Sequence, residues 1–187
     1  MRNFCIQNRV FNFKKIIICR KNRVWHNIKY FPQIFKLYIT YLRNLEDDFS
    51  LFNKDLLEGM LEFIEKSDFY IVIEKEEVCG FFALTNFVGT PKTLYSAEIT
   101  TCFNKKYWGV TTKLLANNFK EYCLNELNLQ KLKALIYAEN HQTRAILKTC
   151  GFEKEATLCA ETLRNGKPQD IYVYSFFKRA NTERNKK

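Results

Sequence analysis

The sequence predicts a mixed α/β (α+β) domain, with helices packed on the faces of a central sheet. Three observations support this class. Short apolar segments with the spacing of strands alternate with segments whose apolar residues recur at helical spacing. Residues 109–128 form the strongest helical pattern, and residues 132–138 form a near-continuous apolar run typical of a buried strand. With 187 residues, 47% of them hydrophobic, the chain can bury one core.

The first half of the chain predicts strands on either side of a helical region. Residues 11–19 have the pattern of a first strand. Residues 28–45 predict one or two helices interrupted near Pro32, because proline cannot donate a helical hydrogen bond. Residues 50–67 predict a further helix with one apolar face. The strands expected to follow are residues 69–74 and 78–87, paired as a hairpin across the charged turn Lys75, Glu76 and Glu77, and residues 94–103.

The second half predicts a crossover and a final hairpin. After the helix at 109–128 and the strand at 132–138, residues 143–149 predict a short helix. Gly151 can end that helix, because glycine tolerates the left-handed conformation. Residues 152–162 and 171–177 then pair across Asn165-Gly166, a strong hairpin signal.

The charge of the chain lies at its two ends. Residues 1–45 carry ten Lys and Arg and no Asp or Glu, and residues 178–187 carry five against one Glu. These ends account for the formal net charge of +10. We therefore divide the chain into a basic N-terminal extension (1–10), a single domain (11–177) and a basic C-terminal tail (178–187). Such ends are compatible with contact to RNA or the ribosome, and equally with a solvated basic surface.

Cysteine and histidine usage argues against disulfides and metal sites. The seven cysteines are an odd number without Cys-x-x-Cys spacing, which favours free thiols in a reducing compartment. Two histidines make a structural zinc site improbable, so we expect no metal. No run approaches the ~20 apolar residues that cross a bilayer. We expect a cytoplasmic protein without membrane contact, either monomer or homodimer.

The segment from Lys105 to Thr112 is the most informative in the chain. It follows an apolar strand and opens the amphipathic helix. The first amides of a helix lack partners and lie at the positive end of its dipole, so this turn predicts an anion site. A phosphate-bearing ligand is the expected occupant.

Four features in order resemble the GNAT N-acetyltransferases, within them the ribosomal-protein-alanine N-acetyltransferase branch. They are Trp108-Gly109, Asn140 after the next strand, Gly151-Phe152 after the short helix, and Asp170 in the last hairpin. The resemblance covers residues 11–177. It implies a mostly antiparallel sheet with splayed central strands, acetyl-CoA as cosubstrate, and direct attack by an amine acceptor.

The resemblance also assigns the site. It places the pyrophosphate loop over Lys106, Trp108, Gly109, Val110 and Thr111, where Lys106 and Thr111 depart from the usual residues. Asn140 would hold the pantetheine arm, although a helix cap is its simpler role.

For the chemistry, the resemblance implies an oxyanion donor from the backbone of Cys102 or Phe103, at a bulged strand end. Glu98 matches the general base of some members, with a structural ion pair as its alternative. A tyrosine general acid of many members is replaced by Leu147. Water, Tyr137 or His141 could protonate the leaving thiolate. Burial as small apolar residues explains Cys102 and Cys150 better than a role as nucleophiles.

The acceptor is the least determined part of the prediction. A protein N-terminus is the first expectation. A small amine, such as a polyamine, would favour an acidic pocket, for which only Glu46, Asp47 and Asp48 cluster suitably. An aminoacyl-tRNA is a further alternative for the acceptor. The alternative to an enzyme is a non-catalytic module of this fold that binds CoA or RNA.

Overall fold

The computed structural model describes residues 3–6, 9–19, 24–48, 55–90 and 93–178. Within these residues nine strands form one sheet in the order β1-β2-β4-β5-β6-β7-β9-β8, with β3 paired to β2 outside this order. The strands are β1 Asn3–Ile6, β2 Arg9–Cys19, β3 Val24–His26, β4 Asp68–Glu74, β5 Glu77–Thr90, β6 Thr93–Phe103, β7 Lys131–Tyr137, β8 Glu153–Arg164 and β9 Lys167–Phe177. The helices are η1 Ile28–Tyr30, α1 Phe31–Thr40, α2 Leu42–Leu45, α4 Leu56–Glu65, η2 Lys105–Tyr107, α5 Val110–Asn125 and α6 His141–Thr149.

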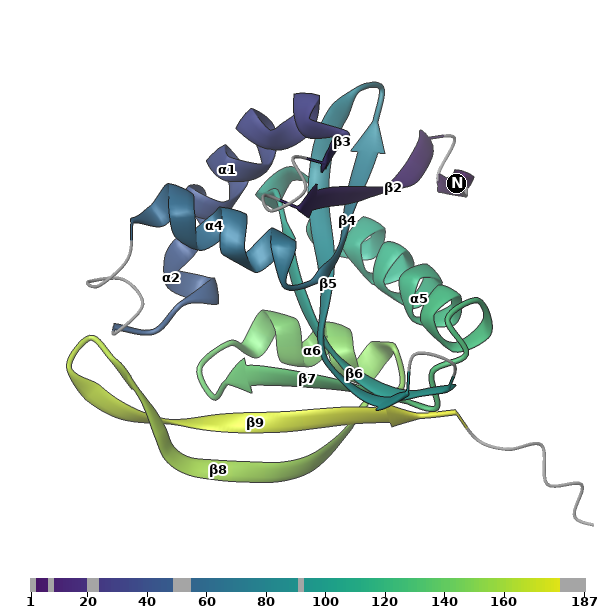
Figure 1. Ribbon diagram of the computed structural model, residues 1–187. Helices are drawn as coiled ribbons and strands as arrows, with labels where there is room; N and C mark the ends of the chain where they lie inside the picture. The colour runs from purple at the N-terminus through teal and green to yellow at the C-terminus, as the bar shows by residue number, and fades with distance from the viewer. Residues whose placement is uncertain (1–2, 7–8, 20–23, 49–54, 91–92, 179–187) are drawn as a thin grey trace, which may run out of the picture.

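Helices cover both faces of the sheet, as predicted (Figure 1). On one face α1 and α4 pack on alternate residues of β4 and β5, in a core that includes Ile34, Met60 and Phe81. On the other face α5 and α6 pack on the residues in between, in a core around Phe82 and Phe119. Their rings stack with centroids 4.3 Å apart. The two cores follow from the period-two alternation of β4 and β5, whose side chains are buried on both sides.

The central strands part, which confirms the expected splay. Of the pairs described, only β6 and β7 run parallel, and their register stops after Ser96↔Lys131, Ala97↔Leu132 and Glu98↔Lys133. Beyond Glu98, β6 stays paired with β5 up to Phe103, and β7 stays paired with β9 up to Tyr137. The far halves of β6 and β7 therefore diverge, and a gap opens in the middle of the sheet.

Most expected elements are confirmed, with shifted ends. Pro32 lies in the first turn of α1, where its missing amide costs nothing, so it starts the helix instead of interrupting it. Asp55 caps α4 with its carboxylate, and residues 50–54 of the expected helix lie outside the described part. The expectation of a fully buried strand at 132–138 was wrong. β7 buries Leu132, Ala134 and Ile136 under the helices, whereas Leu135 on the opposite face is 43% exposed.

Two strands were not expected. β1 pairs antiparallel with the start of β2, so described residues of the segment 1–10 belong to the sheet. β3 pairs with the end of β2. Of the segment 178–187, only Lys178 is described.

Both predicted hairpin turns are present. Lys75 and Glu76 have positive φ angles of 46° and 66°, and Tyr30 and Lys29 donate hydrogen bonds to Glu76 and hold it there. Asn165 and Gly166 have φ angles of 53° and 69°, the conformation for which Asn-Gly is favoured.

Candidate active site

A cleft lies at the point where β6 and β7 part. It consists of two adjoining cavities of about 300 and 260 Å³. Seven residues line both cavities: Asn44, Leu45, Thr101, Thr112, Asn140, Thr143 and Ile146. Among the described lining residues the only charged side chains are Lys113 and Lys120, and there is no carboxylate. The cleft therefore suits an uncharged or anionic ligand.

The ladder between β5 and β6 determines which backbone groups face the cleft. The amide of Asn104 donates to the carbonyl of Cys79, 2.9 Å away. Hydrogen-bonded and non-bonded pairs alternate along an antiparallel ladder. The amide of Cys102 therefore faces β5, whereas the amides of Thr101 and Phe103 point away from β5, toward the gap. In agreement, the carbonyl of Phe103 accepts a hydrogen bond of 2.8 Å from the Trp108 indole across the loop.

The two backbone amides that we expected as oxyanion donors differ in direction. The amide of Phe103 has the right direction for an oxyanion donor, and the amide of Cys102 does not. The expected bulge at Cys102 and Phe103 was wrong, because their register with Phe81 and Gly80 is regular. The irregularities of this strand pair lie farther back, between Thr85 and Gly89.

Fewer amides are available in the loop before α5 than we expected. The amide of Lys105 donates to the Tyr41 hydroxyl and that of Lys106 to the Asn104 side chain. Those of Tyr107 and Trp108 donate to carbonyls of the preceding turn. The first helical hydrogen bond of α5 runs from Lys113 to Gly109. The donors that a helix start leaves without a helical partner thus belong to residues 110–112, at the positive end of the helix dipole.

Gly109 makes this sharp entry into α5 possible. Its φ of 93° and ψ of −129° lie in a region that residues with a Cβ rarely adopt. The next turn is fixed by the Thr112 hydroxyl, which donates to the Tyr107 carbonyl at 2.7 Å. Trp108 packs over Tyr41, with ring centroids 5.8 Å apart. Residues 105–109 therefore form a rigid corner that presents the start of α5 to the cleft.

Asn140 lines both cavities from the far side of the gap. It caps α6, since its side-chain oxygen accepts the Thr143 amide at 3.0 Å. The capping role is thus present, and the side-chain NH₂ group remains to donate toward the cleft.

The structure brings five of the nine predicted residues to the cleft, namely Cys102, Phe103, Trp108, Gly109 and Asn140. The side chains of Lys106, Val110 and Thr111 do not line it. Lys106 forms an ion pair with Glu77 instead. Glu98 also lies off the lining. Its carboxylate accepts hydrogen bonds from the Lys133 ammonium group at 2.8 Å and from the Asn86 side-chain amide at 2.7 Å. Glu98 and Lys133 form the last residue pair that joins β6 to β7.

Several lining residues were missed in the sequence. Tyr41 lies at the junction of α1 and α2, and Asn44 and Leu45 belong to α2. No local signal links them to residues about 60 positions later in the chain. Thr112 and Lys113 belong to the helix start and could have been inferred from the loop itself.

Among the thiols and hydroxyls near the cleft, Tyr137 has a suitable position for chemistry. It lines the smaller cavity, and burial raises its pKa to about 12, so that it is protonated at neutral pH. His141 does not line either cavity and contacts Arg144. Burial raises the pKa of the Cys102 thiol to about 12 and also raises that of Cys150. Leu147 is buried in the core, 8% exposed. Buried, protonated thiols agree with the interpretation of both cysteines as core residues.

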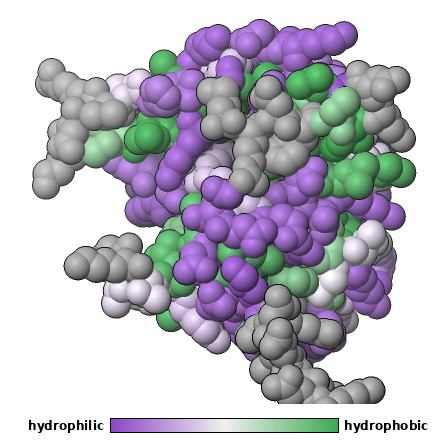
Figure 2. Space-filling model, turned by 90° about the vertical axis from the view of Figure 1, so that its right-hand side faces the viewer, coloured by the Kyte–Doolittle hydropathy of each residue, from purple (hydrophilic) through white to green (hydrophobic). Residues whose placement is uncertain are grey.

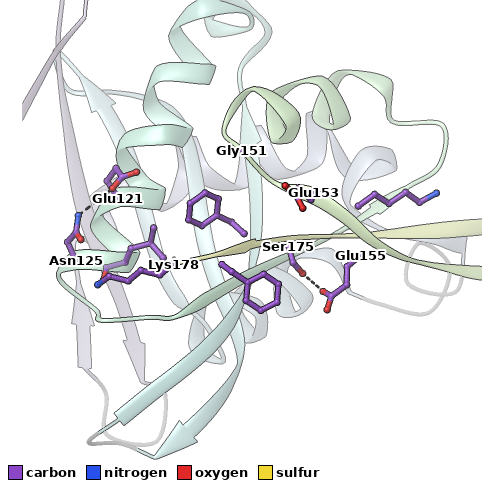
Figure 3. A pocket seen from close by; sticks show the side chains of 11 residues that line it. Glu121, Asn125, Gly151, Glu153, Glu155, Ser175 and Lys178 are labelled. Atoms are coloured by element: carbon purple, nitrogen blue, oxygen red, sulfur yellow. Dashed lines mark hydrogen bonds between the residues drawn. The ribbon is translucent and has the colours of Figure 1, made fainter. Parts of the chain in front are cut away.

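A larger cavity, about 760 Å³, lies at the other end of α5, roughly 20 Å from the loop by the length of the helix (Figure 3). Glu155 bonds Lys131 and Ser175, and Lys178 donates to the Leu124 carbonyl near the end of α5. This cavity shares no described lining residue with the cleft.

None of the helices described is long and apolar enough to cross a membrane. No group of three or more His, Cys, Asp or Glu side chains in the same residues could hold a metal ion. Seen from the side on which α5 lies, the surface is mostly hydrophilic, with separate hydrophobic areas (Figure 2).

A family model for an acetyltransferase (GNAT) domain matches residues 24–153. The chain belongs to the GNAT acetyltransferases. This membership confirms the predicted enzyme class, an acyltransferase that acts on amines. No curated protein sequence matches the chain closely enough to narrow the acceptor.

Solved structures agree with the GNAT fold. The ribosomal-protein-S5-alanine acetyltransferase from Vibrio fischeri gives a TM-score of 0.67 at 15% identity, covering 95% of this chain and 97% of that one. RimJ from Mycobacterium smegmatis, in complex with CoA-disulfide, gives 0.71 at 13% identity, covering 94% and 86%. A spermidine N-acetyltransferase from Vibrio cholerae, in complex with CoA and spermine, gives 0.67 at 18% identity, covering 89% and 95%. These likenesses confirm the fold, and they include enzymes named for different acceptors.

Proposed function

We propose that this GNAT enzyme transfers the acetyl group of acetyl-CoA to the α-amino group of a protein N-terminus, by direct attack in a ternary complex. The observation that carries the proposal is a cleft whose described lining has no carboxylate, formed where β6 and β7 part and bordered by the start of α5. Acetyl-CoA supplies a thioester whose carbonyl carbon an amine can attack.

The residues of the cleft fit the parts of acetyl-CoA. The amides of residues 110–112 at the start of α5 fit the diphosphate, and Lys113 adds positive charge beside them. Asn140 and the unpaired edge of β6 offer polar groups to the amides of the pantetheine arm. The Phe103 amide would stabilise negative charge on the thioester oxygen, because it points into the gap. Tyr137 would donate a proton to the leaving sulfur.

The absence of carboxylates from the described cleft lining indicates which kind of amine the cleft suits as acceptor. An amine must lose its proton before it attacks. An α-amino group has a pKa of about 7.7–8.0, so roughly a tenth of it is neutral at pH 7, whereas a lysine side chain, at about 10.4, is almost wholly charged. A cleft that offers no counter-charge favours the amine that arrives neutral.

The acidic cluster that a polyamine would need is engaged elsewhere. Glu46 accepts from the Tyr38 hydroxyl, and Asp47 accepts from Thr162. Asp48 accepts the amides of Asn165 and Gly166 in the β8–β9 turn. Asp47 and Asp48 therefore tie the segment after α2 to the β8–β9 hairpin, and Glu46 is bonded to α1, so all three carboxylates already have partners within the fold.

Glu98 is our proposed general base. It lies on the same face of β6 as Cys102, at the rung where the strands part. Both of its oxygens already accept hydrogen bonds, so taking a proton requires the contact with Lys133 or Asn86 to open.

The described basic residues of β2 and η1 give no specific support to RNA as a partner. Arg9, Lys14, Lys15 and Lys29 each form an ion pair with a carboxylate of the β4 region. Their charge is therefore partly neutralised, and we do not propose RNA as the acceptor.

The test is acetyl transfer to three acceptors at equal concentration: a peptide with a free α-amine and no lysine, the same peptide N-terminally blocked and carrying one lysine, and spermidine. Release of CoA thiol measures turnover, and mass spectrometry locates the acetyl group. We expect product on the free α-amine. Faster transfer to spermidine or to the blocked peptide would overturn the proposed acceptor, and failure to bind acetyl-CoA in calorimetry would overturn the cosubstrate.

A further inference from the structure

The buried side chain of Tyr107 supports the loop before α5. Tyr107 is 1% exposed and is the last residue of η2. Its ring packs edge-on against Phe11 of β2, with centroids 6.2 Å apart. Its carbonyl accepts the hydroxyl of Thr112, in the first turn of α5. The position of Tyr107 therefore sets the position of the helix start.

The hydroxyl of Tyr107 reaches a buried carboxylate of another strand. It donates to Oε2 of Glu74, the last residue of β4, at 3.2 Å. Glu74 is 9% exposed, and a carboxylate so far from water requires a cationic partner.

Arg9 of β2 provides that partner. Its Nε and one terminal nitrogen bond the two oxygens of Glu74, in the two-pronged geometry that arginine and carboxylate favour. The guanidinium group also lies over the Tyr107 ring, 5.1 Å from its centre. This pairing lowers the pKa of Glu74, and it keeps the carboxylate charged at neutral pH.

We infer that Arg9, Glu74 and Tyr107 form a positioning unit that fixes the loop of residues 105–112 for acetyl-CoA. The inference rests on the proposed cosubstrate. None of the three side chains lines the cleft, so the unit acts through the Tyr107 carbonyl and Thr112 on the amides at the start of α5. β2, three strands away from β6 in the sheet, thereby contributes to cofactor affinity.

The test uses Glu74→Gln and Tyr107→Phe, together with their double variant. Each single change should weaken acetyl-CoA binding by about 3- to 10-fold, the factor that corresponds to one ordinary hydrogen bond, and should raise KM without changing kcat. The double variant should bind no worse than the weaker single variant, because both changes disrupt the same unit.

A matched control exists on the same two strands. Lys15 and Asp68 form an ion pair of 2.6 Å that also joins β2 to β4, without touching the loop. Asp68→Asn should therefore leave acetyl-CoA affinity at the wild-type value. Thermal unfolding of all variants separates a general loss of stability from a local effect.

Hydrogen exchange supplies a readout that needs no ligand. In the free protein, the amides of residues 104–113 should exchange faster in Glu74→Gln and Tyr107→Phe than in wild type or Asp68→Asn. Unchanged exchange and unchanged affinity in both variants would overturn the positioning unit. If the wild type fails to bind acetyl-CoA, the proposed cosubstrate is wrong, and the exchange rates alone then decide whether the unit holds the loop.

Discussion

Gly109→Ala isolates the backbone conformation that brings the helix start to the cleft. Gly109 has φ of 93°, and an added Cβ would meet no heavy atom within 4 Å, so the substitution creates strain without a clash. Such a conformation costs a residue with a side chain about 1–3 kcal/mol. If the loop keeps its shape, the free energy of unfolding falls by that amount, which lowers Tm by about 2–12 °C in a chain of this size. If the loop relaxes instead, the cost appears as weaker acetyl-CoA binding, tenfold for each ~1.4 kcal/mol.

The assay combines thermal unfolding with calorimetric titration of acetyl-CoA. The loss in free energy of unfolding and the loss in binding free energy should add up to about 1–3 kcal/mol. Gly166→Ala is the matched control. Gly166 has φ of 69°, an added Cβ there also meets nothing within 4 Å, and the residue lies in the β8–β9 turn away from the cleft. It should lose stability but keep its affinity. A Gly109→Ala protein with wild-type Tm and wild-type affinity would refute the reasoning, as would an equal loss of affinity in the control.

Three further predictions follow from single contacts. Asn140→Asp keeps an oxygen for the Thr143 amide and should keep its Tm while binding acetyl-CoA more weakly, whereas Asn140→Ala should also lose about 1 kcal/mol of stability in thermal unfolding. Glu98→Gln should lower turnover and keep acetyl-CoA affinity, while Lys133→Met, which breaks the same ion pair, should keep turnover; equal losses would make Glu98 a structural residue. Because burial raises the pKa of Cys102 to about 12, iodoacetamide at pH 8 should modify the exposed Cys159 and spare Cys102, and mass spectrometry showing equal rates would contradict the buried thiol.

Local signals predicted the parts of the fold that local chemistry determines. The Asn165-Gly166 turn follows from residues that tolerate positive φ, and Gly151, with φ of 82°, ends α6 for the same reason. The Trp108-Gly109 corner was visible because a glycine between a strand and a helix marks an abrupt change of direction. The order of strands and helices along the chain followed from apolar periodicity, since both cores bury alternate residues of the same strands.

The sequence could not reveal what depends on distant contacts. β7 was expected to be buried on both faces, but helices cover only the face of Ala134, and Leu135 faces the open side. The partner of the Lys105 amide could not be predicted either, because the Tyr41 hydroxyl that accepts it lies 64 residues earlier. Arg9 was assigned to an extension, and its role depends on Glu74, 65 positions away. Each of these outcomes is a tertiary contact without a local pattern.

The place where β6 and β7 part explains why the cleft would suit a ligand with amides. Up to Glu98 the outward backbone groups of β6 meet β7, and beyond it those of Thr101 and Phe103 have no neighbouring strand. Buried backbone groups without partners are costly, so the gap favours a ligand that can supply the missing hydrogen bonds. The ion pair between Glu98 and Lys133 lies at the last shared rung, where the strands begin to diverge. Moving that rung by two residues toward Phe103 would pair Thr101 with β7 and withdraw its backbone groups from the cleft.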